Sequence, residues 1–174
     1  MPILIAIIGA ATAFYFFVIR ARNAANIATD MMDMANDVRL AARRFGFKRQ
    51  TNLHPVESIE DPNLAITAIA LSFLELNDLP TQDQRNAMVV QAQSTLGISK
   101  TDAEEMMVLG RWLMNECNGA DGAISRISRK LFKLDGANGF DPLMTLVKSA
   151  LPEDGLNDKQ RDALDDIKRA FKIR

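Results

Sequence analysis

The sequence predicts an all-α protein made of a single N-terminal transmembrane helix, a long juxtamembrane helix and a compact helical bundle. Two observations support this fold class: an uncharged apolar run lies near the N-terminus, and apolar residues recur at helical spacing through the rest of the chain. No segment shows the sustained period-two alternation of β-branched residues that is typical of strands. We therefore assign residues 1–45 to the anchor and juxtamembrane helix, 46–60 to a linker and 61–174 to the helical domain.

The apolar run extends from Ile3 to Ile19 and contains no charged residue. Its length falls within the range of roughly 17–25 residues that spans a bilayer. Arg20 and Arg22 follow directly and can reach the lipid headgroups, so they are the predicted basic residues of the membrane interface. A cleaved signal peptide is the alternative, but it would need a basic residue before the run. The sequence therefore favours an uncleaved anchor that is embedded in the lipid bilayer.

The charges that flank this run predict its orientation. No basic side chain precedes it, whereas Arg20, Arg22, Arg39, Arg43 and Arg44 follow it. Because loops that remain in the cytoplasm are enriched in Lys and Arg, we expect the helical domain to be cytoplasmic and the N-terminus to be outside. We expect the location to be the bacterial inner membrane, crossed once.

The anchor also has a face of small residues. Ala6, Gly9, Ala10 and Ala13 recur at spacings of three and four. Small residues let a second membrane helix approach closely, and packing drives helix association in lipid. The alternative is that Ala and Gly are simply common in membrane helices. The first interpretation predicts that a larger integral membrane protein complex is the partner.

The helical pattern continues after the anchor. Residues 20–45 contain no Pro or Gly, and apolar residues keep the helical period as far as Phe45. Arg43 and Arg44 belong to a basic cluster near the end of this stretch. The cluster could contact anionic lipid or a partner, but cations also favour a helix C-terminus, and we prefer that interpretation. Gly46 is then expected to end the helix.

Capping residues divide the remaining chain into helices. Asp61-Pro62 predicts a helix start, and the apolar stretch that follows it should be central to the core. Either Ser99 or Thr101 is expected to cap a later helix, with an acidic residue three positions on. Six helices are predicted after the linker. The first begins at Asp61-Pro62, the second extends from Thr81 to Leu96, and the third extends from Ser99 or Thr101 to Cys117. The last three cover residues 123–134, residues 142–150 after Asp141-Pro142, and the range from Asn157 to Phe171.

A weak internal repeat aligns residues 77–88 with residues 153–164. Asp, Gln, Arg and Ala coincide in the two copies, and each copy follows an apolar helix and opens an amphipathic one. Two similar helical hairpins packed together would give a compact bundle.

These features resemble the TerB-like domains of tellurite-resistance proteins. The resemblance rests on the helix end Leu96-Gly97-Ile98 and on the turns Ala120-Asp121-Gly122 and Glu153-Asp154-Gly155, and it covers roughly residues 61–174. It implies an acidic, metal-responsive surface, for which Asp78, Asp121 and Asp154 are the candidate metal ligands. The family often has a Glu one turn after its Asp-Gly, where this chain has Gln84, Gln160 and Ser128. Capping of helix N-termini is the alternative role of Asp78 and Asp154.

Composition limits the chemistry. With one cysteine, Cys117, and one histidine, His54, the chain can form neither an internal disulfide nor a multi-Cys or multi-His metal site. His54 falls in the expected linker, away from Cys117, which we expect to be buried. The net charge of −1 gives no electrostatic reason to expect nucleic acid. We therefore predict no enzyme, no catalytic residue, no cofactor and no small-molecule substrate.

Two classes of function remain after these exclusions. The first is a non-enzymatic accessory or assembly subunit whose anchor and domain dock on a larger inner-membrane complex, such as a respiratory complex. The second is a membrane-tethered stress or metal-responsive protein of the tellurite-resistance type, which is what the family resemblance implies.

Overall fold

The computed structural model describes residues 36–45, 52–76, 79–151 and 155–173. All regular structure in these residues is helical, which confirms the all-α class. The chain divides into two units, Met1–Asp37 and Val38–Arg174. Besides the helical residues 36–44, the elements are η1 (Pro55–Ser58), α2 (Pro62–Leu74), α3 (Gln82–Leu96), α4 (Lys100–Glu116), α5 (Ala120–Asp135), α6 (Phe140–Ser149) and α7 (Asp158–Ala170).

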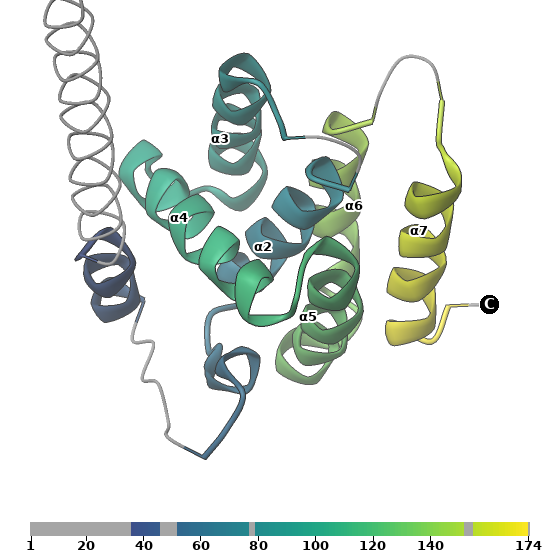
Figure 1. Cartoon of the computed structure of the whole chain (residues 1–174), viewed down its shortest axis with the longest axis horizontal. Coiled ribbons are helices and arrows are strands. Elements are labelled where there is room, and N and C mark those ends of the chain that lie inside the picture. Colours follow the sequence, from purple (N-terminus) through teal and green to yellow (C-terminus); the bar gives the residue numbers. More distant parts are fainter. Residues whose placement is uncertain (1–35, 46–51, 77–78, 152–154, 174) are drawn as a thin grey trace, which may run out of the picture. The chain divides into compact units, whose positions relative to one another are not determined.

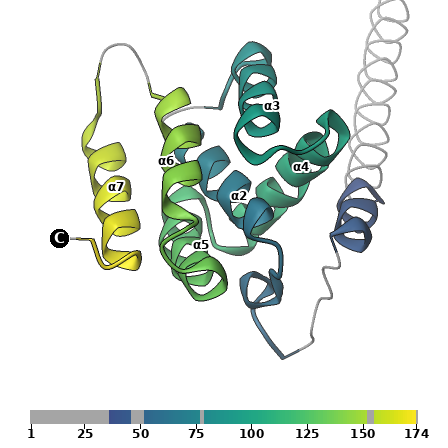
Figure 2. The ribbon, with the colours of Figure 1, turned by 180° about the vertical axis from the view of Figure 1, so that it is seen from behind.

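Helix α2 is the centre of the Val38–Arg174 unit. It packs against α4, α5 and α6, and the two opposite views in Figures 1 and 2 show it enclosed among them. Ten of its residues, from Leu64 to Phe73, are buried. A helix that is apolar on all sides must have neighbours on every side to remove its side chains from water, and a central position provides them. The prediction of a central helix after Asp61-Pro62 is therefore confirmed.

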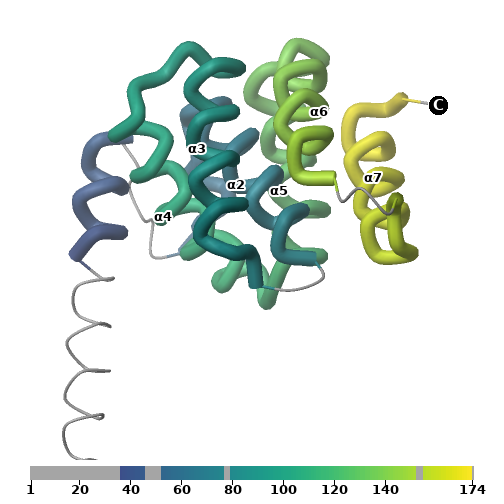
Figure 3. Tube along the Cα trace, turned by 90° about the horizontal axis from the view of Figure 1, so that it is seen from above, coloured from purple at the N-terminus to yellow at the C-terminus, as the bar shows by residue number. Residues whose placement is uncertain are grey.

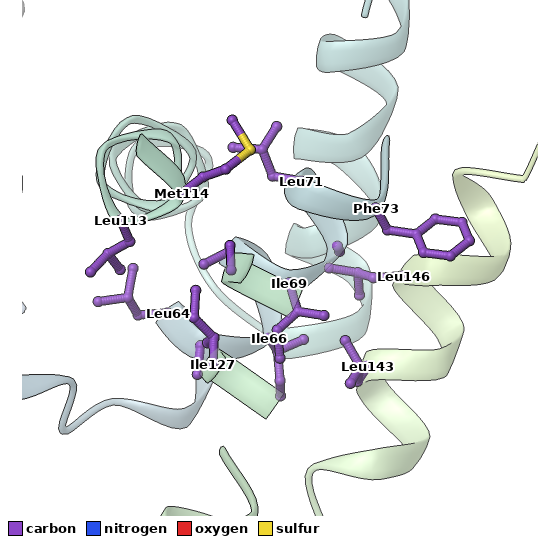
Figure 4. Packing of buried hydrophobic residues seen from close by; sticks show 14 of the residues in the cluster. Leu64, Ile66, Ile69, Leu71, Phe73, Leu113, Met114, Ile127, Leu143 and Leu146 are labelled. Atoms are coloured by element: carbon purple, nitrogen blue, oxygen red, sulfur yellow. The ribbon is translucent and has the colours of Figure 1, made fainter. Parts of the chain in front are cut away.

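Side chains of α2 reach the surrounding helices on every side. In Figure 4, Leu71 points toward α4 and Phe73 toward α6. Leu64 and Phe73 are at most 1% exposed, and full burial of each contributes roughly 1.5–3 kcal/mol to folding. Gly110 of α4 allows a close approach of α4 to α2, because a Cβ atom there would lie 3.1 Å from Cα of Ala68. This crossing depends on a glycine that the sequence analysis did not single out.

Four helices begin at side chains that accept hydrogen bonds from their first-turn backbone. Asp61 Oδ1 accepts from N–H of Asn63 at 2.8 Å. Thr81 and Asn157 each form a reciprocal capping box with the glutamine three residues later, Gln84 and Gln160. Ser99 caps α4, which resolves the choice between Ser99 and Thr101. The two copies of the internal repeat therefore share the same capping box at the start of their helices.

The two repeat copies do not form similar hairpins. Helix α3 packs mainly on α6 and α4, and α7 packs on α5. Figure 3 shows α7 on the outer side of the unit, beyond α5. The hairpin prediction is wrong because helical spacing identifies a buried face without identifying its neighbour.

Three boundaries differ from those that the sequence predicts. Residues 55–59 fall in the expected linker, yet they form η1 and its end, and Val56 and Ile59 are fully buried. Helix α5 begins at Ala120, three residues early, after Gly119. Helix α6 begins at Phe140, so Asp141 and Pro142 lie inside its first turn and do not open it. Phe140 packs against Phe171, with ring centroids 5.3 Å apart, so a tertiary contact accompanies this start.

Candidate functional site

The predicted membrane residues lie outside the part of the chain that the structure describes. Ala6, Gly9, Ala10 and Ala13, as well as Arg20 and Arg22, all fall within residues 1–35. Among the described helices, none combines the length and the apolar character needed to cross a bilayer. The anchor, its small-residue face and its basic flank therefore remain sequence-based predictions.

Of the three candidate metal ligands, the structure describes only Asp121. It is exposed in the first turn of α5, where a carboxylate interacts favourably with the helix dipole. Asp78 and Asp154 lie outside the described residues. Within the described ranges, no three His, Cys, Asp or Glu side chains are grouped so that they could hold a metal ion. The metal set remains a prediction that rests on the family resemblance.

Cys117 is buried at the end of α4, as expected. Burial raises the pKa of its thiol; the Arg126 guanidinium opposes this shift and the Glu116 carboxylate adds to it. A raised pKa keeps the sulfur protonated, whereas a nucleophilic cysteine needs the thiolate. The environment of Cys117 is therefore that of a core residue.

His54 connects the segment before α2 to the end of α4. Its Nδ1 accepts from N–H of Val56 at 3.3 Å, and its Nε2 lies 3.1 Å from the carbonyl oxygen of Glu116. These contacts assign the proton to Nε2, which donates to that carbonyl. His54 falls in the predicted linker, but its ring contacts the carbonyl oxygen of Glu116, the residue before Cys117. Its role in the structure is to cap η1 and to hold η1 on α4.

Residues 38–44 are joined to α4 by a polar cluster that the sequence analysis missed. Arg44 lies 2.8 Å from Oδ1 of Asp102 and 3.2 Å from Oε1 of Glu105, and Ala41 is fully buried beside them. The sequence pattern predicts Arg44 to be a cation at a helix C-terminus, and the structure shows that it also pairs with two carboxylates of α4. The sequence feature that could have identified a partner for Arg44 is Asp102, the acidic residue three positions after Ser99.

Asp102 receives hydrogen bonds from its own helix cap as well as from Arg44. The hydroxyl of Ser99 donates to Oδ2 of Asp102 at 2.6 Å. This hydrogen bond is the main reason that the pKa of Asp102 lies below its usual value of 3.8, and Arg44 lowers it further against the effect of burial. The carboxylate is therefore held in its charged form, which is the form that binds Arg44.

The outward side of α3 carries few charges. Its exposed residues include Asn86, Ala87, Val90 and Ser94, which we call the α3 face. Val90 is 65% exposed, and Leu79, just before the helix, is 80% exposed. Interface cores are depleted of charged residues, because uncharged side chains cost less to desolvate. The composition of the α3 face therefore suits contact with a protein partner.

The geometry described above contains a packed core, caps and ion pairs, together with one weakly charged helix face. It offers a surface for contacts, and no arrangement of nucleophile and base emerges among the described side chains. Comparison of the chain with protein-family models, with curated proteins and with solved structures finds no match.

Proposed function

We propose that this chain is a non-enzymatic, membrane-anchored accessory or assembly subunit that docks on a larger inner-membrane protein complex, such as a respiratory complex. In this proposal the apolar run from Ile3 to Ile19 lies in the bilayer and contacts the complex through its small residues. The helical domain then contacts the cytoplasmic face of the same complex.

One observation carries the proposal: residues 38–44, which belong to the predicted juxtamembrane helix, pack on the helical domain. Ala41 is buried, and Arg44 pairs with Asp102 and Glu105 of α4. This attachment makes residues 38–44 part of the helical domain, which supports a domain that docks on its partner together with the chain segment that precedes it.

The α3 face supports the proposed contact between the helical domain and the cytoplasmic face of the complex. Its uncharged polar side chains surround the exposed Val90, and Leu79 lies at the start of the same region. Isolated exposed apolar residues are common, so Val90 alone would indicate little. Its position within a face of low charge is what favours a protein contact.

Membrane integration is the first test of the proposal. Carbonate extraction at high pH should leave the full chain in the membrane pellet, and a C-terminal reporter should be active only in the cytoplasm. Affinity purification in a mild detergent should then recover a stoichiometric membrane complex. Release by carbonate would contradict the anchor. Recovery of a monomer whose melting temperature depends on added metal would favour the metal-responsive alternative.

A further inference from the structure

A basic groove of about 560 Å³ lies between α5 and α7. Arg129 and Lys133 line it from α5, Arg169 lines it from α7, and Lys172 follows the end of α7. Asp166 is the one carboxylate among the described residues of its lining. The groove therefore carries a net charge of +3 on a protein whose overall net charge is −1.

The four cations of the groove differ in how far they are neutralised. Arg169 forms an ion pair with Asp166, and Nζ of Lys133 lies 3.9 Å from a carboxylate oxygen of Glu57. Within the described ranges, neither Arg129 nor Lys172 forms an ion pair. Two cations thus face the groove without a counter-charge from the described chain.

Helix dipoles explain only part of this charge. Lys133 and Arg169 lie in the last turns of their helices, where cations are favoured whatever the function. Lys172 directly follows the C-cap of α7, where the dipole also favours a cation. Arg129 lies in the middle of α5, so the same account does not extend to it.

The backbone places Lys172 over the groove at a conformational cost. Its φ is +58°, in the left-handed region, where glycine is the usual residue after a helix end. The N–H of Ile173 donates to the carbonyl of Lys168 at 3.0 Å and closes this turn. Nζ of Lys172 consequently lies 5.1 Å from the ring centroid of Phe132, which lines the groove and packs edge-on against Phe171. Lys172 thus forms a cation–π contact with an aromatic side chain of the groove lining.

This chemistry selects the class of ligand. A guanidinium binds phosphate oxygens through two parallel N–H donors, and an ammonium adds a point charge. A phosphomonoester carries a charge of about −1.5 to −2, so it complements the groove better than a single carboxylate does. We propose that the α5–α7 groove binds a phosphate group, held by Arg129 and Lys172. The group can belong to a soluble molecule or to a lipid headgroup.

Lysine footprinting of the full chain in non-ionic detergent tests the site directly. Inorganic pyrophosphate is the probe, in a buffer free of other phosphate, and acetylation is measured by mass spectrometry. We expect pyrophosphate to slow acetylation of Lys133 and Lys172 several-fold. Lys100 is the matched control, because its side chain is 72% exposed and that of Lys133 is 69% exposed. Equal protection of all three lysines, or no protection, would overturn the proposal.

Variants separate the site from general charge attraction. Arg129→Gln and Lys172→Gln should each weaken pyrophosphate binding by roughly tenfold in calorimetry, which is the usual loss for a hydrogen bond to a charged group. Lys159→Gln removes a charge from α7 outside the groove and should change binding less than about twofold. Lys172→Gly suits the left-handed backbone, so it should lose binding without losing stability. The same loss in Lys159→Gln and Lys172→Gln would contradict the site.

Lipid composition identifies the source of the phosphate. The full chain is placed in nanodiscs of phosphatidylcholine, with or without phosphatidic acid. Protection of Lys133 and Lys172 that appears with phosphatidic acid alone assigns a headgroup ligand. Protection that requires added pyrophosphate in both lipids assigns a soluble ligand. Absence of protection in every condition overturns the proposal. The detergent experiment does not depend on the anchor, so its outcome is independent of the proposed accessory function.

Discussion

Gly110 sets how closely the two most extensively packed helices of the domain can approach. A methyl group there would press on the backbone of Ala68 at 3.1 Å. We expect Gly110→Ala to lower the free energy of unfolding by about 1 kcal/mol, because an overpacking cost of about 2 kcal/mol exceeds the helix-propensity gain of about 1 kcal/mol. Urea denaturation followed by fluorescence of Trp112, the only tryptophan, measures this change. Thr101→Ala, at an exposed position of the same helix, should be neutral or stabilising. A more stable Gly110→Ala protein would show that α2 can move away.

Glu75 is a carboxylate at the end of α2 whose side chain is only 7% exposed, and Arg111 of α4 is its ion-pair partner. Arg111→Met should lower the free energy of unfolding by roughly 2–3 kcal/mol, since it leaves a buried charge at the negative end of a helix. Adding Glu75→Gln should restore most of the loss, because an uncharged amide costs less to bury. Urea denaturation of the two single variants and the double variant tests the coupling, and simple additivity would contradict it.

Asp102 makes part of the stability depend on pH. Its folded-state pKa is below the usual 3.8, so its contribution is complete above that value and is lost as the pH falls through the folded-state pKa. The stability difference between wild type and Asp102→Asn should therefore be constant near neutral pH and narrow below about pH 4. Urea denaturation across this pH range measures it. Ser99→Ala removes the main cause of the lowered pKa, so the narrowing should be smaller and should be complete at a higher pH. A difference that stays constant down to pH 2 would contradict this assignment.

At the scale of elements, the repeated capping box makes a prediction about α7. Among the described helices α7 packs chiefly on α5, so loss of its cap should act locally. Asn157→Ala should lower helix stability by about 1 kcal/mol and accelerate hydrogen exchange in α7 while leaving α2 unchanged. Asn157→Asp keeps an acceptor and should behave like wild type. Equal acceleration in α2 would show that α7 unfolds only with the whole domain.

Local signals made much of this fold predictable from the sequence. Asp61, Thr81 and Asn157 mark helix starts because a cap needs only the chain beside it, and α2 is recognisable because its apolar character is continuous. The start of α6 was missed because Phe140 packs on a residue 31 positions later, Phe171. The burial of Val56 was missed for a similar reason, since the preceding His54 binds the carbonyl of Glu116 across the fold.

The candidate sites were less predictable than the helices. The ion pairs of Arg44 join residues that are far apart in the sequence, and periodicity does not report such pairs. The α5–α7 groove was also missed, because its charges come from two helices that show their shared side only after folding. The anchor face rests on spacing alone, so it can be tested only by substitution.

At the scale of the whole molecule, the proposed docking uses both the anchor and the α3 face, and substitutions can test each contribution separately. Gly9→Leu/Ala13→Leu should stay in the membrane but lose co-purification with the complex, since bulk at these positions keeps the helices apart. Leu4→Val and Phe16→Leu should have little effect.

Val90→Lys tests the domain contact and should reduce the yield of the complex, whereas Thr101→Lys, on an exposed site of α4, should not. Affinity purification with quantitative mass spectrometry measures each yield. Unchanged recovery of the Gly9→Leu/Ala13→Leu protein would place recognition in the domain alone, and unchanged recovery of Val90→Lys would place it in the anchor alone.

The central position of α2 has a consequence for synthesis. Helices α4, α5 and α6 cover α2 in the folded domain, but they are synthesised after it. The nascent chain therefore exposes the apolar α2 segment until these helices have been translated. Its 13 residues are fewer than the roughly 17–25 that span a bilayer, whereas the run from Ile3 to Ile19 falls within that range. Insertion machinery that meets two apolar segments in succession can thus distinguish them by length. Added residues that lengthen α2 by two turns would remove this difference in length. The core helix would then compete with the first apolar segment as a signal for membrane insertion.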